Sequence, residues 1–109
     1  MAHFLIQASY TSEGWASLVK NPQNHGDLIR AVIERLGGKI DNVFWAFGDY
    51  DIVAIVQMPD NASAAAFSVA AAAGGAVKSI RTTPLMTGEE GLVFLKKAGT
   101  AGYRAPGAS

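Results

Sequence analysis

Hydrophobic residues alternate with polar ones in some segments of the chain and recur at helical spacing in others. Residues 3–10 alternate as a half-buried strand does, and a short helical turn is expected at 15–20. In the next segment an apolar position recurs every three or four residues, at Leu28, Ile29, Val32, Ile33 and Leu36. This spacing predicts an amphipathic helix that begins at Pro22, with Asn21 as N-cap, and ends at Gly37-Gly38.

The rest of the chain predicts two strands, a helix, a strand and a final short helix. In chain order these are residues 39–47, 51–58, 62–73, 77–85 and 89–97. The order is therefore β-α-β-β-α-β, the arrangement of a ferredoxin-like α+β fold with a four-stranded antiparallel sheet and both helices on one face. The alanine-rich helix is expected to pack closely on the sheet, because its side chains are small.

The strand at 51–58 is apolar on both of its faces. Its residues Ile52 to Val56 do not alternate with polar ones, although a sheet face that meets water should be polar. Two helices can cover only one face of the sheet, so an apolar patch would stay open in a monomer. The sequence therefore predicts a homodimer, or a higher homo-oligomer, in which two sheets face each other as in a dimeric α/β barrel.

Polar residues interrupt the apolar pattern on the two outer strands. If these residues lie on the same face as Trp45, the dimer interior combines an aromatic floor with a few polar groups, as a small-molecule pocket does. The expected ligand is small and apolar or anionic. The candidate ligand-binding residues are His3, Gln7, Trp45, Tyr50, Arg81 and Thr83.

Composition and charge narrow the possible functions. A chain of 109 residues predicts one domain, placed at residues 1–98, with a C-terminal tail at 99–109. The formal net charge is zero, which argues against nucleic-acid binding, and no cysteine is present for disulfides or thiolate chemistry. No secretion signal or membrane-spanning segment is recognised, so a cytoplasmic protein is expected.

The segment Gly48-Asp49-Tyr50-Asp51 is the first candidate for chemistry. Two carboxylates beside a phenol are suited to proton transfer or to cation binding. The same residues also suit a tight hairpin turn, with Gly48 at positive φ and the Tyr50 hydroxyl bonded to backbone. The structural interpretation is favoured, since neighbouring turn residues rarely converge on one point.

Arg81 and the two histidines are the other polar candidates. Arg81 is expected to face the dimer interior, where it either binds a ligand carboxylate or phosphate or pairs with Asp41, Asp49 or Asp51. His3 is either a general base or haem ligand or a merely hydrogen-bonded strand residue, and His25 is expected to be exposed. No spacing of metal ligands is recognised, and no cofactor is predicted.

Residues 46–53, which read Ala-Phe-Gly-Asp-Tyr-Asp-Ile-Val, resemble the signature of the GYD domain family. Further matches follow in the family's order at Tyr10-Thr11, Leu36-Gly37-Gly38-Lys39, Pro59-Asp60 and Ile80-Arg81-Thr82-Thr83. The resemblance covers about residues 4–90. It implies a ferredoxin-like, dimeric α/β-barrel domain without an established activity.

Three functions stay open on this evidence. The leading hypothesis is a small-molecule-binding or accessory protein that forms a homodimer. The first alternative is an enzyme of the cofactor-independent monooxygenase or isomerase type, with Trp45, Arg81 and His3 around a planar substrate. The second is a structural building block of a larger assembly, held by the tail that contains Tyr103.

Overall fold

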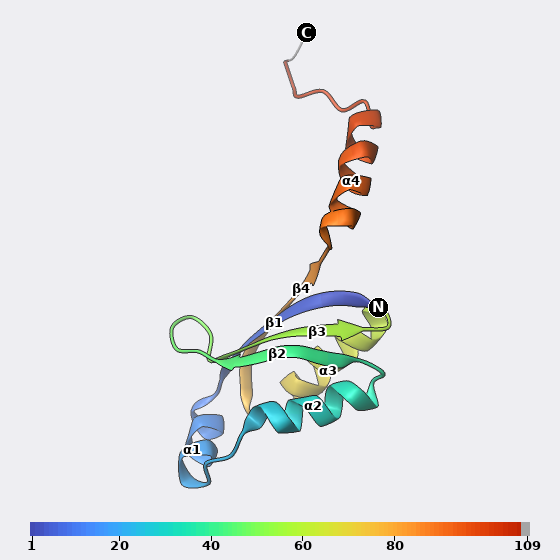
Figure 1. Ribbon diagram of the computed structural model, residues 1–109. Helices are drawn as coiled ribbons and strands as arrows, with labels where there is room; N and C mark the ends of the chain where they lie inside the picture. Colours follow the sequence, from blue (N-terminus) through green and yellow to red (C-terminus); the bar gives the residue numbers. More distant parts are fainter. Residues whose placement is uncertain (108–109) are drawn as a thin grey trace.

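The computed structural model describes residues 1–107 and confirms the predicted α+β architecture (Figure 1). The strands are β1 (Ala2–Tyr10), β2 (Lys39–Trp45), β3 (Ile52–Met58) and β4 (Val77–Leu85). The helices are α1 (Ser12–Lys20), α2 (His25–Arg35), α3 (Asn61–Ala73) and α4 (Gly88–Thr100). All neighbouring strands are antiparallel and follow the order β2-β3-β1-β4, which is consistent with a ferredoxin-like fold.

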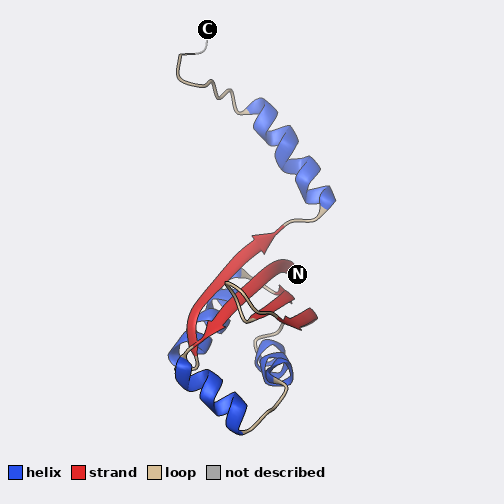
Figure 2. Ribbon diagram, turned by 90° about the vertical axis from the view of Figure 1, so that its left-hand side faces the viewer, coloured by secondary structure: helices blue, strands red, loops and turns tan. Residues whose placement is uncertain are grey.

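Helices α2 and α3 lie on one side of the sheet and enclose the core with it (Figure 2). The even-numbered residues of β3, and those of β1 from Phe4 onward, point toward these helices and are buried, among them Ile6, Val56 and Met58. Ile29 and Ile33, one turn apart on α2, meet them from the helix layer. No helix or strand among the described residues covers the opposite face of the sheet, and the loop between β2 and β3 covers its end at Ser9, which is buried.

A bulge in β2 changes which of its residues face the core. Ile40 pairs with Val56, but the register shifts before Asn42, so that Trp45 pairs with the core residue Ile52. Trp45 therefore lies on the helix side, while Phe44 turns to the open side. The expectation that Trp45 shares a face with the odd residues of β1 and β4 is wrong, because one inserted residue exchanges the two faces of a strand.

Several element boundaries also differ from the predicted ones. Helix α2 begins at His25, because the side chain of Asn24, and not of Asn21, accepts the hydrogen bond from the Gly26 N–H. Strand β2 ends at Trp45 and strand β3 begins at Ile52, so the connection between them is longer than the predicted three-residue turn. Helix α1 forms two full turns from Ser12 instead of the single turn expected.

The C-terminal helix α4 stands away from the rest of the molecule (Figures 1 and 2). A Thr87–Glu90 capping box starts it, and it continues to Thr100, beyond the predicted end at residue 97. The radius of gyration is 17.7 Å, whereas a compact chain of this length has about 13 Å. The division into a domain at 1–98 and a tail at 99–109 stays a prediction, and residues 108–109 lie outside the described part.

Gly48 adopts φ = 142°, as predicted for this hairpin. Nothing lies within 4 Å of a Cβ built on it, so a substitution there meets backbone strain and no clash. We expect Gly48→Ala to lower the free energy of unfolding by about 1 kcal/mol or more, measured by urea denaturation. Gly88→Ala, in open space at the start of α4, is the control and should be neutral or slightly stabilising; equal effects of the two changes would contradict the strain.

Candidate functional site

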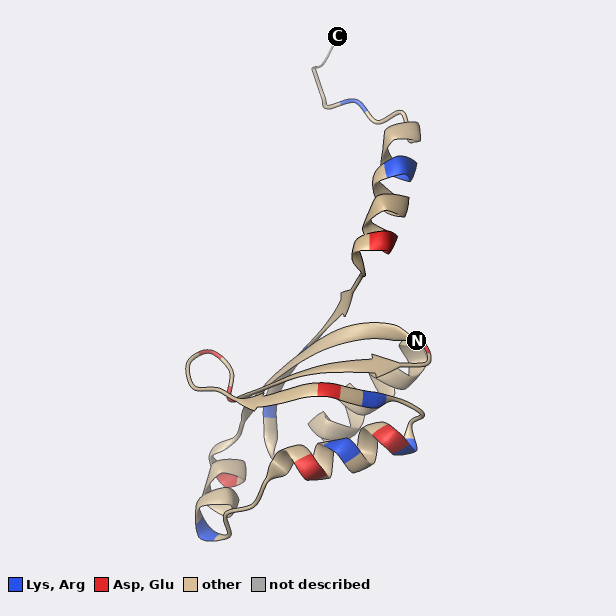
Figure 3. Cartoon of the chain, in the orientation of Figure 1, with Lys and Arg blue, Asp and Glu red and all other residues tan. Residues whose placement is uncertain are grey.

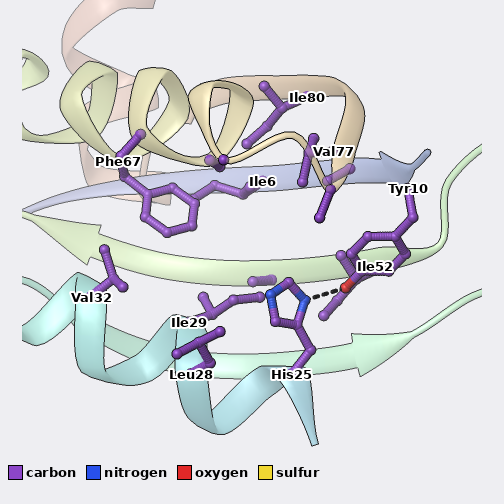
Figure 4. Close-up of a pocket in the computed structure, with 16 residues that line it drawn as sticks. Ile6, Tyr10, His25, Leu28, Ile29, Val32, Ile52, Phe67, Val77 and Ile80 are labelled. Carbon is purple, nitrogen blue, oxygen red and sulfur yellow. Dashed lines mark hydrogen bonds between the residues drawn. The ribbon is translucent and has the colours of Figure 1, made fainter. Parts of the chain in front are cut away.

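A cavity of about 290 Å³ lies between the sheet and the two helices that cover it (Figure 4). Strands β1 and β3 form its floor, α2 and α3 form its walls, and the start of β4 closes one side. Its lining is almost entirely apolar and includes Ile6, Ile29, Val32, Ile52, Phe67 and Ile80. The cavity therefore has the partly enclosed, apolar character of a small-molecule site, although its volume is at the low end for one.

The composition of α3 explains why this space is open. The side of α3 that lines the cavity presents Ala70 and Ala71, and only Phe67 reaches far toward the sheet. Protein interiors normally leave few voids larger than a water molecule. The small side chains of this helix thus leave a space beside α2, instead of the uniformly close packing that we expected from them.

Tyr10 and His25 supply the polar end of the cavity. Their side chains are joined by a hydrogen bond between the Tyr10 hydroxyl and the His25 Nδ1 (Figure 4). Two tryptophans extend this pair into an aromatic cluster, with the Trp15 ring edge-on to Tyr10 at a centroid distance of 5.1 Å and the Trp45 ring at 6.1 Å. The packing of the two tryptophan rings, together with the hydrogen bond between Tyr10 and His25, fixes the orientation of the phenol and the imidazole.

Burial keeps this pair uncharged near neutral pH. Burial, together with the negative charge of Asp51, raises the pKa of Tyr10 to about 12. Burial also lowers the pKa of His25 below its ordinary value of 6.5. A neutral phenol and a neutral imidazole can bind a polar group of a ligand, and residues of these two types can also exchange protons.

The Gly48-Asp49-Tyr50-Asp51 loop holds the end of β1 where Tyr10 lies. The Asp51 carboxylate accepts a 2.9 Å hydrogen bond from the Tyr10 backbone N–H. The Ser9 hydroxyl donates to the Asp49 backbone carbonyl, also at 2.9 Å. These contacts favour the structural interpretation of the motif, because its carboxylate and carbonyl are used to position β1.

The residues predicted to bind a ligand are divided among three places. His3, Gln7, Arg81 and Thr83 share the open face of the sheet, where Gln7 pairs with Arg81 across β1 and β4. Trp45 lies on the other side of the sheet with the aromatic cluster. Tyr50 lies in the loop between β2 and β3. The constellation of Trp45, Arg81 and His3 around one substrate is therefore wrong for a single chain.

Arg81 is exposed on the open face. Of the carboxylates proposed to pair with it, that of Asp41 accepts hydrogen bonds from Gln57 and that of Asp51 accepts from the Tyr10 backbone. Both carboxylates thus contact groups other than Arg81.

Sequence reasoning did not identify Tyr10 and His25 as site residues. His25 was expected to be exposed, but it is half-buried, since α2 begins at this residue and directs its side chain toward Tyr10. The alanine-rich composition of residues 62–73 was the available signal for a cavity. No group of three or more potential metal ligands occurs within residues 1–107.

Comparison with known proteins gives a family and one relative with a functional name. Residues 4–93 match the model of the GYD domain family. Over 80 residues, the chain is 28% identical to a Thermus thermophilus protein named glutamine synthetase and cystathionine beta-lyase binding protein. The match covers 73% of this chain and 84% of that relative. No solved structure matches the chain significantly.

In the described part of the chain, no helix is long and apolar enough to span a membrane.

The shifted pKa values predict how stability depends on pH. The pKa of Tyr10 is higher in the folded protein (about 12) than its ordinary value of 10.0. The contribution of the Tyr10 phenol to the free energy of unfolding is therefore complete below pH 10 and is lost as the pH rises toward 12. The pKa of His25 is lowered on folding, so its contribution is present above pH 6.5 and is lost as the pH falls below that value.

Thermal unfolding midpoints of the wild type and Tyr10→Phe across pH measure the alkaline part of this prediction. The difference between the two midpoints should shrink between pH 10 and 12, because only the wild type loses the contribution of the phenol. A difference that stays constant over this range would contradict the raised pKa. His25→Asn tests the acid side in the same way below pH 6.5.

Proposed function

This chain belongs to the GYD domain family, and on that premise we propose that it is a cytoplasmic, homodimeric accessory protein that acts by binding another protein. The observation that carries the proposal is the open face of the sheet. Its centre is apolar, and no element among the described residues covers it. The name of the Thermus relative, a binding protein for two other proteins, supports the same kind of role.

The centre of the open face lies on the two central strands. Leu5 on β1 pairs with Ile55 on β3, and Val53 lies beside Phe44, which is 60% exposed. Charged residues lie on α1, α2 and α4 and on the outer strands β2 and β4, and none lies on the central strands β1 and β3 (Figure 3). A twofold axis through the central strands would pack this apolar patch against the same patch of a second copy of the chain and remove both from water.

The polar residues of the open face would then lie in or around the dimer interface. His3, Gln7, Arg81 and Thr83 flank the apolar centre on β1 and β4. In such an interface Arg81 requires a carboxylate or phosphate, because an unpaired buried charge is strongly destabilising. A carboxylate of the second copy and an anionic ligand both meet this requirement.

Helix α4 is a second unpartnered apolar surface. Leu92, Phe94, Leu95 and Ala98 lie on one side of the helix, and Glu89, Glu90, Lys96 and Lys97 lie on the other, where Val93 is the one apolar side chain among them. Leu92 and Leu95 are both 61% exposed. We assign this apolar side to the partner protein, since an amphipathic helix can bind by laying its apolar side into a groove.

A second candidate function is acid–base catalysis in the cavity. The observation that favours it is the hydrogen-bonded pair of Tyr10 and His25, whose residue types serve as general acids and bases. Native mass spectrometry of the purified protein would reveal any co-purified molecule. Catalysis requires that the wild type converts this molecule to a product and that Tyr10→Phe does not.

The homodimer predicts a specific response to charge on the open face. Val53→Asp should yield a folded monomer, because an aspartate there is solvated in the monomer but unpaired in the interface. Native mass spectrometry and sedimentation at micromolar concentration measure the subunit number. Ser79→Asp introduces the same charge at the end of the same face and should stay dimeric. A wild-type protein that is monomeric at all concentrations would contradict the dimer.

The role of α4 predicts a separate effect on partner binding. Purified glutamine synthetase is the first partner to test, as the name of the relative suggests. The double variant Leu92→Glu/Leu95→Glu should weaken its binding at least tenfold, measured by calorimetry, with no change in dimer mass. Lys96→Glu makes the same change in net charge on the polar side and should bind within about twofold of the wild type. Loss of the dimer in the double variant would instead place α4 in the dimer interface.

A further inference from the structure

Beyond protein binding, we infer that the cavity between α2, α3 and the sheet binds a small, neutral, largely apolar molecule that carries one hydroxyl group. Cavity volume and apolar lining set the size and character of the ligand. Tyr10 and His25 recognise its hydroxyl. The site is separate from the open face and from α4, so it does not depend on either surface having a partner.

The volume limits the ligand to about two fused rings. An engineered apolar cavity of about 150 Å³ holds one benzene molecule, and this cavity has about twice that volume at 290 Å³. Its walls are aliphatic or aromatic, with Ile29 and Ile52 on one side and Phe67 and Ile80 on the other. A bicyclic aromatic or a branched hydrocarbon of similar volume would fill it.

The lining also determines the charge of the ligand. No Lys, Arg, Asp or Glu is among the lining residues found within the described chain. An ion placed there would lose its hydration without a compensating charge, which is strongly unfavourable. A carboxylate ligand is therefore excluded from this cavity, although the sequence had left an anionic ligand open.

The Tyr10–His25 pair is suited to a hydroxyl group in particular. If the phenol donates to Nδ1, the imidazole keeps a donor at Nε2 and the phenol oxygen keeps acceptor capacity. If Nδ1–H donates instead, Nε2 becomes the acceptor and the phenol keeps its donor. Both arrangements leave one donor and one acceptor, at opposite ends of the pair. A ligand hydroxyl both donates and accepts, so in either arrangement it can bond to the phenol oxygen or to Nε2, one of the two at a time.

A neighbouring hollow provides the path by which a ligand enters. This hollow, of about 400 Å³, shares Tyr10, His25 and Leu28 with the cavity, and its border also includes the polar residues Glu13, Ser17 and Gln23, which the cavity lacks. The polar pair thus lies where the apolar space meets a wetter one. A ligand would place its hydrocarbon part inward and its hydroxyl at this junction.

Three naphthalene-based probes test the ligand class on the purified full-length protein. The probes are 2-naphthol, naphthalene and 2-naphthoate, with binding followed by calorimetry and by NMR of the ¹⁵N-labelled protein. We expect 2-naphthol to bind about 3- to 10-fold more tightly than naphthalene, as one additional hydrogen bond predicts, and 2-naphthoate to bind most weakly. No binding of any probe up to its solubility limit, or preference for the naphthoate, would overturn the inference.

Two variants locate the binding. Ala71→Leu fills the cavity from α3 and should reduce 2-naphthol binding more than tenfold, whereas Ala72→Leu adds the same atoms to an exposed position of that helix and should bind within twofold of the wild type. The double variant Tyr10→Phe/His25→Leu should remove the preference for naphthol over naphthalene while keeping naphthalene binding. Unchanged naphthol binding by Ala71→Leu would place the probe elsewhere.

The NMR spectra keep the test decisive if Ala71→Leu does not fold. Shifts caused by 2-naphthol in the wild type should concentrate in α2, α3 and the adjoining parts of β1 and β3. Shifts confined to the open face or to α4 would overturn the site. Dimer mass and binding to glutamine synthetase are separate measurements, so failure of the ligand site and failure of the proposed function can be told apart.

Discussion

A single layer of helices on a sheet whose central strands are apolar on both sides governs this structure. Strands β1 and β3 bury Ile6, Val56 and their even-numbered neighbours under α2 and α3. The same strands present Leu5, Val53 and Ile55 to the other side, where the chain supplies no cover among its described residues. Removal of this surface from water requires a second molecule, and the proposed dimer follows from that requirement.

The helix layer also leaves space within its own half of the molecule. Helix α3 contributes many alanines, so the volume of its side chains does not fill the distance between the sheet and α2. The resulting cavity ends at Tyr10, a residue that four separate segments position. Asp51 binds its backbone N–H, His25 binds its hydroxyl, and Trp15 and Trp45 pack against its ring.

The segment Gly48-Asp49-Tyr50-Asp51 therefore acts on the candidate site indirectly, through its contacts with β1. Its Asp51 and Asp49 hold the end of β1 through backbone contacts, and the charge of Asp51 contributes to the raised pKa of Tyr10. Gly48 allows the chain to turn so that these contacts form. In this arrangement, the motif that identifies the family supports the site and does not itself line the cavity.

Local patterns in the sequence were sufficient to determine the order of strands and helices, the positive φ at Gly48 and the apolar character of both faces of β3. Each of these follows from the spacing of residues within one segment or from the chemistry of one residue type.

Other features depend on how segments meet. The bulge that moves Trp45 to the helix side is visible only in the pairing of β2 with β3. The cavity depends on the summed side-chain volumes of four elements, and the bond between Tyr10 and His25 depends on where α2 begins relative to the end of β1. Tertiary structure decided these, because strand register and packing volume are properties of contacts between segments, and the spacing of residues within a segment does not contain them.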